Sequence, residues 1–257
     1  KQMAAWGEIN SEITKEITSA FRVIDITQNK LSAFVAIQLD MLDLGPVFLD
    51  AYIRRCLLEA LACGLEDGIV NGTGLNQPIG LIRDIHEGVS VSTSTGYPAK
   101  TKITVTDFTP KTYGGLVAQL AQTERGKMRR VGKIVLLVNP VDYYNKIVPA
   151  TTVMGTDGLY RADVLPVPTT IIQTTALASG DAVLFLPDEY KLLAGGRRSS
   201  TIEYSDEYKF LEDQRVFKIK QYGMGRAFDN TSAILLDISN LDPAFITVKN
   251  HEKVETA

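Results

Sequence analysis

The feature that most constrains this chain is a helical pattern of unusual length that begins at Pro46. Proline is favoured at the first position of a helix, so the pair Gly45-Pro46 marks a helix start. Apolar residues follow at helical spacing up to about Val70, charged residues take up much of the opposite side, and Asn71-Gly72 ends the pattern. About 25 residues at 1.5 Å each give a rod of about 37 Å, so we expect a large part of the chain to pack along it.

The rest of the chain mixes strand and helix patterns without a regular succession of the two. Residues 31–42 (LSAFVAIQLDML) are apolar enough for a buried strand that bends toward a helix, and residues 133–138 (KIVLLV) are typical of a strand buried on both faces. A helix is expected from about Pro110 to Gln122, with Asp107 as its N-cap. Further strands are expected at 21–27, 103–105, 164–167, 170–173, 182–186, 216–222 and 233–238. The fold class is therefore α+β, with long antiparallel strands.

Two further signals concern the region that follows the buried strand at 133–138. Asn139-Pro140 is expected to start a short helix, because asparagine favours the N-cap and proline the first helical position. Residues 149–160 contain glycine, threonine and aspartate, so they are expected to form an exposed loop.

Composition and charge argue against several classes of protein. With 257 residues, 45% of them hydrophobic, the chain can bury the core of one large domain or two modest ones. Its apolar stretches fall short of the roughly 20 residues that cross a bilayer, and no secretory signal is visible. The formal net charge of −3 and the pI of about 5.5 do not favour tight binding of duplex DNA. Because the chain begins with Lys1 instead of methionine, we expect an upstream segment.

Two cysteines, Cys56 and Cys63, fall within the predicted long helix. Seven residues apart, they would lie two turns apart, about 10 Å, which is too far for a disulfide. We therefore expect both to be small buried hydrophobes in a reducing compartment.

The chain offers few residues for acid–base or nucleophilic catalysis. There are two histidines, His86 and His251, and His251 lies in a polar C-terminal tail. No Gly-x-Ser-x-Gly elbow accompanies His86, so the sequence names no catalytic residues. An α+β hydrolase with His86 as its base stays open as an alternative.

Signals for a metal or a cofactor are equally sparse. No histidine lies near the cysteines, and no aspartate-rich calcium loop occurs. The sequence Asn71-Gly72-Thr73-Gly74 lacks the lysine of a phosphate-binding loop and follows a helix instead of a strand, so we interpret it as a helix end and turn. We expect no metal site and no cofactor.

Charged residues gather in a few short segments of the sequence. The carboxylates near residue 205 could pair for acid–base chemistry, although a solvated acidic loop is far commoner. Basic and acidic patches on one subunit would also suit head-to-tail assembly, with ordinary solvated faces as the alternative. The basic residues are Arg125, Lys127, Arg129, Arg130 and Lys133 with the pair Arg197-Arg198, and the acidic ones are Glu203, Asp206, Glu207, Glu212 and Asp213.

Taken in order, these features resemble the phage capsid family, the major capsid proteins of tailed phages with the HK-97 fold. The connector after the long helix (NGTGLNQPIGL) matches at Gly72, Gly74, Pro78 and Gly80. The other resembling segments are Ala5-Trp6-Gly7-Glu8, residues 21–43, residues 133–147 (KIVLLVNPVDYYNKI), residues 156–160 (TDGLY) and residues 203–239. Together they cover nearly the whole chain.

The resemblance implies a subunit with a peripheral domain, which holds the long "spine" helix at 46–70, and an axial domain that points at the five-fold and six-fold axes. Some relatives cross-link their subunits through a lysine, but no residue here can be matched to that site. The implied division is 1–26, remnant of an extended hairpin loop; 27–105, first segment of the peripheral domain; 106–201, axial domain; 202–245, second segment of the peripheral domain; and 246–257, C-terminal tail.

The function implied by the resemblance is structural and not enzymatic. The chain would assemble with itself into pentamers and hexamers of an icosahedral shell that encloses DNA, in the virion of a tailed phage or prophage, and assembly would take place in the bacterial host cytoplasm. A scaffold or maturation protease and a portal would be partners, packaged DNA would be contacted non-specifically, and no membrane would be involved. Two other structural alternatives are an encapsulin-type nanocompartment shell protein and a phage tail or accessory protein.

Overall fold

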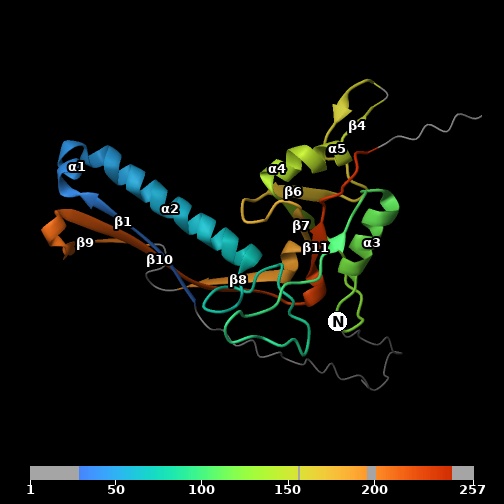
Figure 1. Cartoon of the computed structure of the whole chain (residues 1–257), viewed down its shortest axis with the longest axis horizontal. Helices are drawn as coiled ribbons and strands as arrows, with labels where there is room; N and C mark the ends of the chain where they lie inside the picture. The colour runs from blue at the N-terminus through green and yellow to red at the C-terminus, as the bar shows by residue number, and fades with distance from the viewer. Residues whose placement is uncertain (1–28, 156, 196–200, 245–257) are drawn as a thin grey trace, which may run out of the picture.

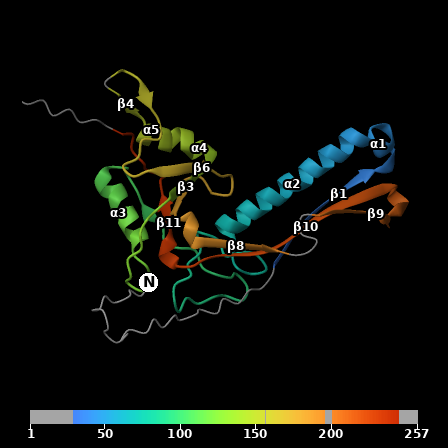
Figure 2. The same cartoon turned by 180° about the vertical axis from the view of Figure 1, so that it is seen from behind.

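The computed structural model describes residues 29–155, 157–195 and 201–244. The molecule has an elongated half and a compact half, which Figures 1 and 2 show from opposite sides. The elongated half holds the long helix α2 (Pro46–Asn71) and a four-stranded sheet, and the compact half holds a five-stranded sheet with most of the other helices. The predictions for 1–26, 246–257, the strand at 21–27, His251 and the pair Arg197-Arg198 lie outside the described residues.

The elongated half is an antiparallel sheet with α2 packed along one face. β10 is the central strand: β1 pairs with it on one edge over its whole length, from Asn29 opposite Gly223 to Gln38 opposite Gln214. β9 and β8 share the other edge of β10. The bounds are β1, Asn29–Gln38; α1, Leu39–Leu44; β8, Tyr190–Gly195; β9, Ile202–Lys209; a 3-10 turn, η3, Phe210–Glu212; and β10, Gln214–Ala227.

A narrow apolar stripe joins α2 to this sheet. β1 alternates, so that Leu31, Ala33, Val35 and Ile37 face the helix while Lys30, Ser32 and Phe34 face away. From the helix, Ile53, Leu57 and Leu61 lie at four-residue spacing and pack against Phe217 and Ile219 of β10. Two segments far apart in the sequence therefore form one layer under the helix, and the expectation of a long packed helix from Pro46 is confirmed.

The compact half is built on a mixed sheet with the strand order β2-β11-β7-β3-β6. β3 (Ile134–Val138) is buried at all five residues, as its continuous apolar sequence predicts. It runs parallel to β6 and antiparallel to β7. The other strands are β2, Ile103–Thr104; β6, Thr169–Gln173; β7, Asp181–Phe185; and β11, Ala233–Asp237.

Both faces of the five-stranded sheet are covered. Tyr113, Leu116 and Leu120 of α3 pack on one face with Leu136 of β3. On the other face, Val70 at the end of α2 and Leu81 of the connector pack against the sheet. The helices are α3, Pro110–Ala121; α4, Pro140–Asp142; the π-helix η1, Tyr143–Ile147; and α5, Val148–Thr151, and the remaining elements are β4, Val153–Met154; β5, Tyr160–Arg161; and the 3-10 turns η2, Pro187–Glu189, and η4, Asn230–Ser232.

The connector after α2 confirms the interpretation of NGTGLNQPIGL as a helix end and turn. The chain doubles back at once, so that Gly80 N donates to Gly72 O at 2.8 Å and Leu81 N to Ile69 O at 2.8 Å. A Cβ atom at Gly72 would overlap the carbonyl oxygen of Pro78, and one at Gly80 would overlap the carbonyl oxygen of Val70. Glycine is required at both positions because two backbone segments touch there.

Several local predictions are corrected by the structure. The N-cap of α3 is Thr109 and not Asp107, because the hydroxyl of Thr109 accepts from Thr112 N. The side chain of Asp107 accepts from the backbone N of Thr109, just before the helix. Cys63 is exposed and Cys56 only partly buried, because the stripe at Ile53, Leu57 and Leu61 faces the sheet and the cysteines lie beside it.

The observed strands differ from the predictions in several places. Residues 164–167 form no strand, and the expected loop at 149–160 contains α5 and a short hairpin made by β4 and β5. β8 was not predicted at all. The two sheets also do not follow the predicted domain boundaries. β8 lies within residues 106–201 but pairs with β10, and β11 lies within residues 202–245 but pairs with β7.

Candidate assembly surfaces

A group of strongly exposed apolar side chains lies on the hairpin of β9 and β10, at the far end of the elongated half (Figure 1). Leu211 is 97% exposed and Phe210 77%, and both lie in η3, the turn of the hairpin. Tyr204 and Tyr208 on β9 are exposed as well. A projecting group of large apolar side chains is a common mark of a protein contact surface.

The charges on this hairpin pair with one another. Arg215 forms a bidentate salt bridge with Asp206, in which Nε donates to Oδ1 at 2.5 Å and Nη2 to Oδ2 at 2.8 Å. That guanidinium holds the pKa of Asp206 below its usual range. Glu203 lies 3.2 Å from Lys218 Nζ and 3.3 Å from Lys220 Nζ, and the hydrogen bonds from these two amines lower its pKa.

These pairs change the interpretation of the acidic segment. With Lys209 paired to Glu212 at 2.7 Å, three of the five predicted acidic residues are matched by cations of the same hairpin. The sequence could not show the pairs of Glu203 and Asp206, because their partners lie on the neighbouring strand β10. The surface of this hairpin therefore combines exposed aromatic and aliphatic side chains with charges that are partly paired within the hairpin.

A second exposed apolar group lies on the hairpin of β4 and β5, which projects from the compact half (Figure 1). Its exposed side chains are Met154, Leu159 and Tyr160. Asp157 holds the turn, accepting from Leu159 N and pairing with Arg161 at 3.3 Å. This segment includes most of TDGLY, the sequence for which the resemblance implies a contact around a capsomer axis.

The base of this second hairpin is tied to the helices below it. The hydroxyl of Tyr143, in the π-helix η1, donates to the carboxylate of Asp163 at 3.0 Å. Val164 N donates to Thr151 O at 3.0 Å. The base of the hairpin is therefore held by hydrogen bonds, and its tip is exposed.

The face of the four-stranded sheet turned away from α2 forms a broad groove. Its volume is about 980 Å³, and Phe34 of β1 and Tyr222 of β10 contribute apolar surface to it. Lys30, Lys218, Lys220 and Glu203 supply its charged groups. Within the described part of the chain, no helix covers this face.

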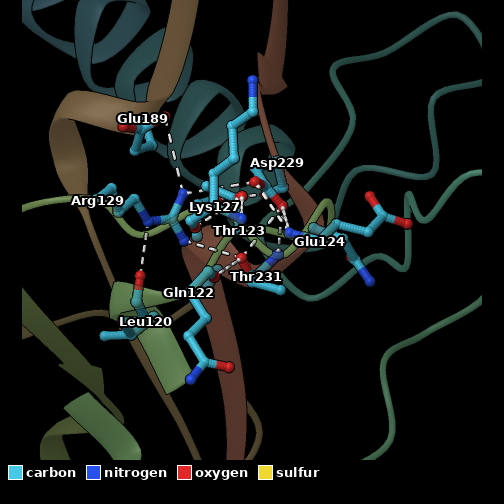
Figure 3. A network of polar contacts seen from close by, with 12 residues as sticks. Leu120, Gln122, Thr123, Glu124, Lys127, Arg129, Glu189, Asp229 and Thr231 are labelled. Atoms are coloured by element: carbon cyan, nitrogen blue, oxygen red, sulfur yellow. Dashed lines mark hydrogen bonds and ion pairs between the residues drawn. The ribbon is translucent and has the colours of Figure 1, made fainter. Parts of the chain in front are cut away.

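The predicted basic run does not act as one patch. Arg129 is only 11% exposed, and it donates to Leu120 O at 2.6 Å and to Thr231 Oγ1 at 3.0 Å (Figure 3). Arg125 lies 3.4 Å from Glu87 on the surface. Lys127, Arg130 and Lys133 are exposed as well, so the run divides into an internal cation and a dispersed surface group.

His86, the candidate base of the hydrolase alternative, lies in an exposed loop. Its Nδ1 is 2.9 Å from Asp84 Oδ1, and the same oxygen accepts from His86 N and from Asn230 Nδ2. Burial raises the pKa of Asp84, but the bonds from His86 and Asn230 outweigh it and leave that pKa below the ordinary value. The hydrogen bonds that the structure describes for His86 include none to a serine, threonine or cysteine side chain, and Asp84 anchors the loop to Asn230.

Neither a metal site nor a membrane-spanning helix is found among the described residues. No group of three or more histidine, cysteine, aspartate or glutamate side chains there is placed to hold a metal ion. None of the described helices combines the length and the hydropathy that a bilayer span needs.

The sequence model of the Phage capsid family matches residues 1–158 of this chain, and the chain belongs to that family. The fold is the HK-97 fold of capsids. The capsid of an empty GTA particle superposes with a TM-score of 0.58 at 12% identity, over 90% of this chain and 81% of that one. The procapsid of satellite phage P4 gives 0.55 at 11%, over 94% and 87%.

A shell protein of another kind shares the fold. The SrpI encapsulin of Synechococcus elongatus superposes with a TM-score of 0.51 at 15% identity, over 84% of this chain and 74% of that one. No curated protein sequence matches the chain. Family and fold together identify a structural protein that forms part of a capsid.

Proposed function

We propose that this chain is the major capsid protein of a tailed phage or prophage, and that copies of it assemble into the pentamers and hexamers of an icosahedral shell around DNA. The observation that carries the proposal is the pair of exposed apolar hairpins, one on each half of a subunit that belongs to the Phage capsid family. Surfaces on different parts of one subunit allow each copy to contact several neighbours at once.

The energetics of such a shell favour many modest contacts. Burial of apolar surface contributes about 25 cal/mol per Å², so a few side chains such as Leu211 and Phe210 give only a weak contact by themselves. When one subunit makes several such contacts, each holds the others at high effective concentration, and the closed shell becomes stable. A shell protein needs this arrangement and does not need a catalytic constellation.

The division of labour within the subunit follows from the two hairpins. We assign the four-stranded sheet with α2 to the peripheral domain and the β4–β5 hairpin to the axial end, where copies meet around five-fold and six-fold axes. The subunit would assemble in the host cytoplasm with a scaffold or maturation protease and a portal, and would contact packaged DNA without sequence preference. No enzymatic step is assigned to it.

Encapsulin-type shells are the second candidate, because the encapsulin fold superposes on this chain. The contents of the particle distinguish the two. A phage shell isolated from cells that carry the whole phage or prophage encloses DNA, whereas a nanocompartment encloses protein cargo. The ratio of absorbance at 260 nm and 280 nm before and after nuclease treatment measures the difference.

Electron microscopy and sedimentation of the full-length gene product test the proposal. We expect closed particles, or pentamers and hexamers. Leu211→Asp should reduce assembly strongly, because a desolvated carboxylate would replace an apolar contact. Val91→Asp is the matched control, since Val91 is exposed but lies outside both hairpins. A wild-type protein that stays monomeric at high concentration would overturn the shell function.

A further inference from the structure

The chain passes between its two sheets three times, and all three crossing segments meet at one place. The first crossing segment is 72–102, between α2 and β2; the second is 186–189, between β7 and β8; and the third is 228–232, between β10 and β11. Every path from the elongated half to the compact half runs through one of them.

The first and third crossing segments are joined by a partly buried lysine and an aspartate. Lys100 Nζ donates to the carbonyl oxygens of Asn230 and Ala233, the latter at 2.7 Å. The side chain of Asn230 donates to Asp84 Oδ1 at 2.7 Å and accepts from Ile85 N at 3.1 Å. Three hydrogen bonds that involve side chains thus bind these two segments to each other, and a fourth joins Lys100 to Ala233, the first residue of β11.

Backbone hydrogen bonds join the second crossing segment to the third. Leu186 N donates to Ser232 O and Phe228 N to Glu189 O, both at 2.9 Å. Apolar packing also links the halves here, through Val70 at the end of α2. Apolar contacts of that kind are non-directional, whereas hydrogen bonds fix the relative orientation of the groups that make them.

Arg129 reaches into this place from the segment that follows α3 (Figure 3). Besides its bond to Thr231, its Nη1 lies 3.8 Å from Asp229 Oδ2 and 3.9 Å from Glu189 Oε2. Asp229 also accepts from Glu124 N at 3.3 Å and from Thr231 N at 3.1 Å. The cation therefore lies between the second and third crossing segments. The junction cluster consists of Asp84, Lys100, Glu124, Arg129, Glu189, Asp229, Asn230 and Thr231.

The charges of the junction cluster make it sensitive to the loss of one member. The carboxylates of Asp84, Glu189 and Asp229 accompany two cations, Lys100 and Arg129. Glu124 contributes its backbone N–H, and its carboxylate accepts from Glu87 N at 2.7 Å. Burial lowers the pKa of Lys100 to about 8, although Asp84 and Asp229 act in the opposite direction. Removing one partner from such a network leaves others without compensation, so the network holds one geometry.

We propose that the junction cluster fixes the angle between the two sheets of the subunit and, through that angle, the curvature of the shell. The effect on curvature rests on the proposed function. A small change of this angle produces a large displacement at the far end of the elongated half. The elongated half extends along α2, whose 26 residues span about 39 Å. A tilt of about 5° at the junction would move the exposed hairpin at its far end by about 3 Å. A displacement of that size changes how neighbouring copies meet, and therefore how strongly the shell curves.

The test compares conservative variants of the full-length protein with matched controls. Arg129→Lys, Asp229→Asn and Lys100→Met each weaken the junction cluster. Arg130→Lys and Lys102→Met are the controls, because Arg130 is the exposed neighbour of Arg129 and Lys102 pairs with Asp181 at 2.6 Å outside the cluster. Particle diameters are measured by electron microscopy, and the shape of the unassembled subunit is measured by small-angle X-ray scattering.

We expect the single diameter peak of wild-type shells to broaden, shift or be lost in the cluster variants, and to stay unchanged in the controls. The scattering profile of the unassembled cluster variants should change as well. Cluster variants that unfold at a lower temperature, yet keep the wild-type diameter and scattering profile, would overturn the proposal. A wild-type protein that forms no shells would overturn the proposed function instead, and the scattering comparison would still decide the role of the cluster in setting the angle.

Discussion

The two halves of this subunit bury their apolar residues very differently. Within the described residues, the core between α2 and its sheet has five buried members, whereas the core on one face of the five-stranded sheet has sixteen. The compact half covers its sheet on both faces, and the elongated half leaves one face and the tip of a hairpin open. Intrinsic stability therefore resides mainly in the compact half, and the elongated half keeps surface available for contacts with other copies.

The largest expected effect comes from truncating the larger core. Leu136 is fully buried between β7 and β6, so Leu136→Ala should lower the free energy of unfolding by about 2–5 kcal/mol. Leu57→Ala in the elongated half should cost less, because the thin core beside it can close around the gap. Urea unfolding of both variants measures the difference, and equal losses would contradict the comparison of the halves.

A buried ion pair in the compact half gives the next effect. Asp142 accepts from Gly180 N at 2.6 Å and from Ser179 at 3.1 Å, and it lies 3.0 Å from Lys146 Nζ. Burial raises the pKa of Asp142, but these three partners together bring it below the ordinary value. Asp142→Asn should therefore lower the free energy of unfolding at neutral pH by about 1.5–3 kcal/mol.

The sign of the pH dependence follows from that lowered pKa. The stabilising effect of the carboxylate is complete above the ordinary aspartate pKa, and it is lost as the pH falls through the lower pKa of the folded state. The stability gap between wild type and Asp142→Asn should shrink as the pH falls from about 5 toward 2. Denaturation at several pH values measures it, and a constant gap would contradict the assignment.

The connector between the halves gives a prediction of similar or smaller size. Gly72→Ala places a methyl group against the Pro78 carbonyl and should lower the free energy of unfolding by about 1–3 kcal/mol. Gly114 provides the control, because it lies in α3 with open space around it. Gly114→Ala should raise stability by about 0.5–1 kcal/mol, and calorimetry of both variants should show opposite shifts in Tm.

The smallest effect is expected at the hairpin of β9 and β10. The pair formed by Arg215 and Asp206 lies near the surface, so Asp206→Asn should leave the free energy of unfolding nearly unchanged. The same variant should weaken assembly more than stability, because the pair shapes an exposed contact surface. Sedimentation of the variant beside Asp50→Asn, a change in another exposed pair, measures this.

The sequence alone determined the elements whose signals are local. The helix from Pro46, the buried strand at Ile134–Val138 and the helix start at Asn139 follow from periodicity, apolar runs and capping. The order of these elements also carried the resemblance to capsid proteins and, with it, the fold. These signals act between residues close in the chain, so a linear pattern contains them.

Only the tertiary structure decided which strands share a sheet and which charges meet. β8 and β11 belong to the sheet on the other side of the predicted domain boundary. Arg129, predicted as part of a basic run, is largely buried in the junction cluster, and Glu203 pairs with lysines of the neighbouring strand. The free energy of each of these arrangements comes from contacts between segments separated by dozens of residues or across two strands. A local pattern cannot encode such contacts, because they exist only once the chain has folded.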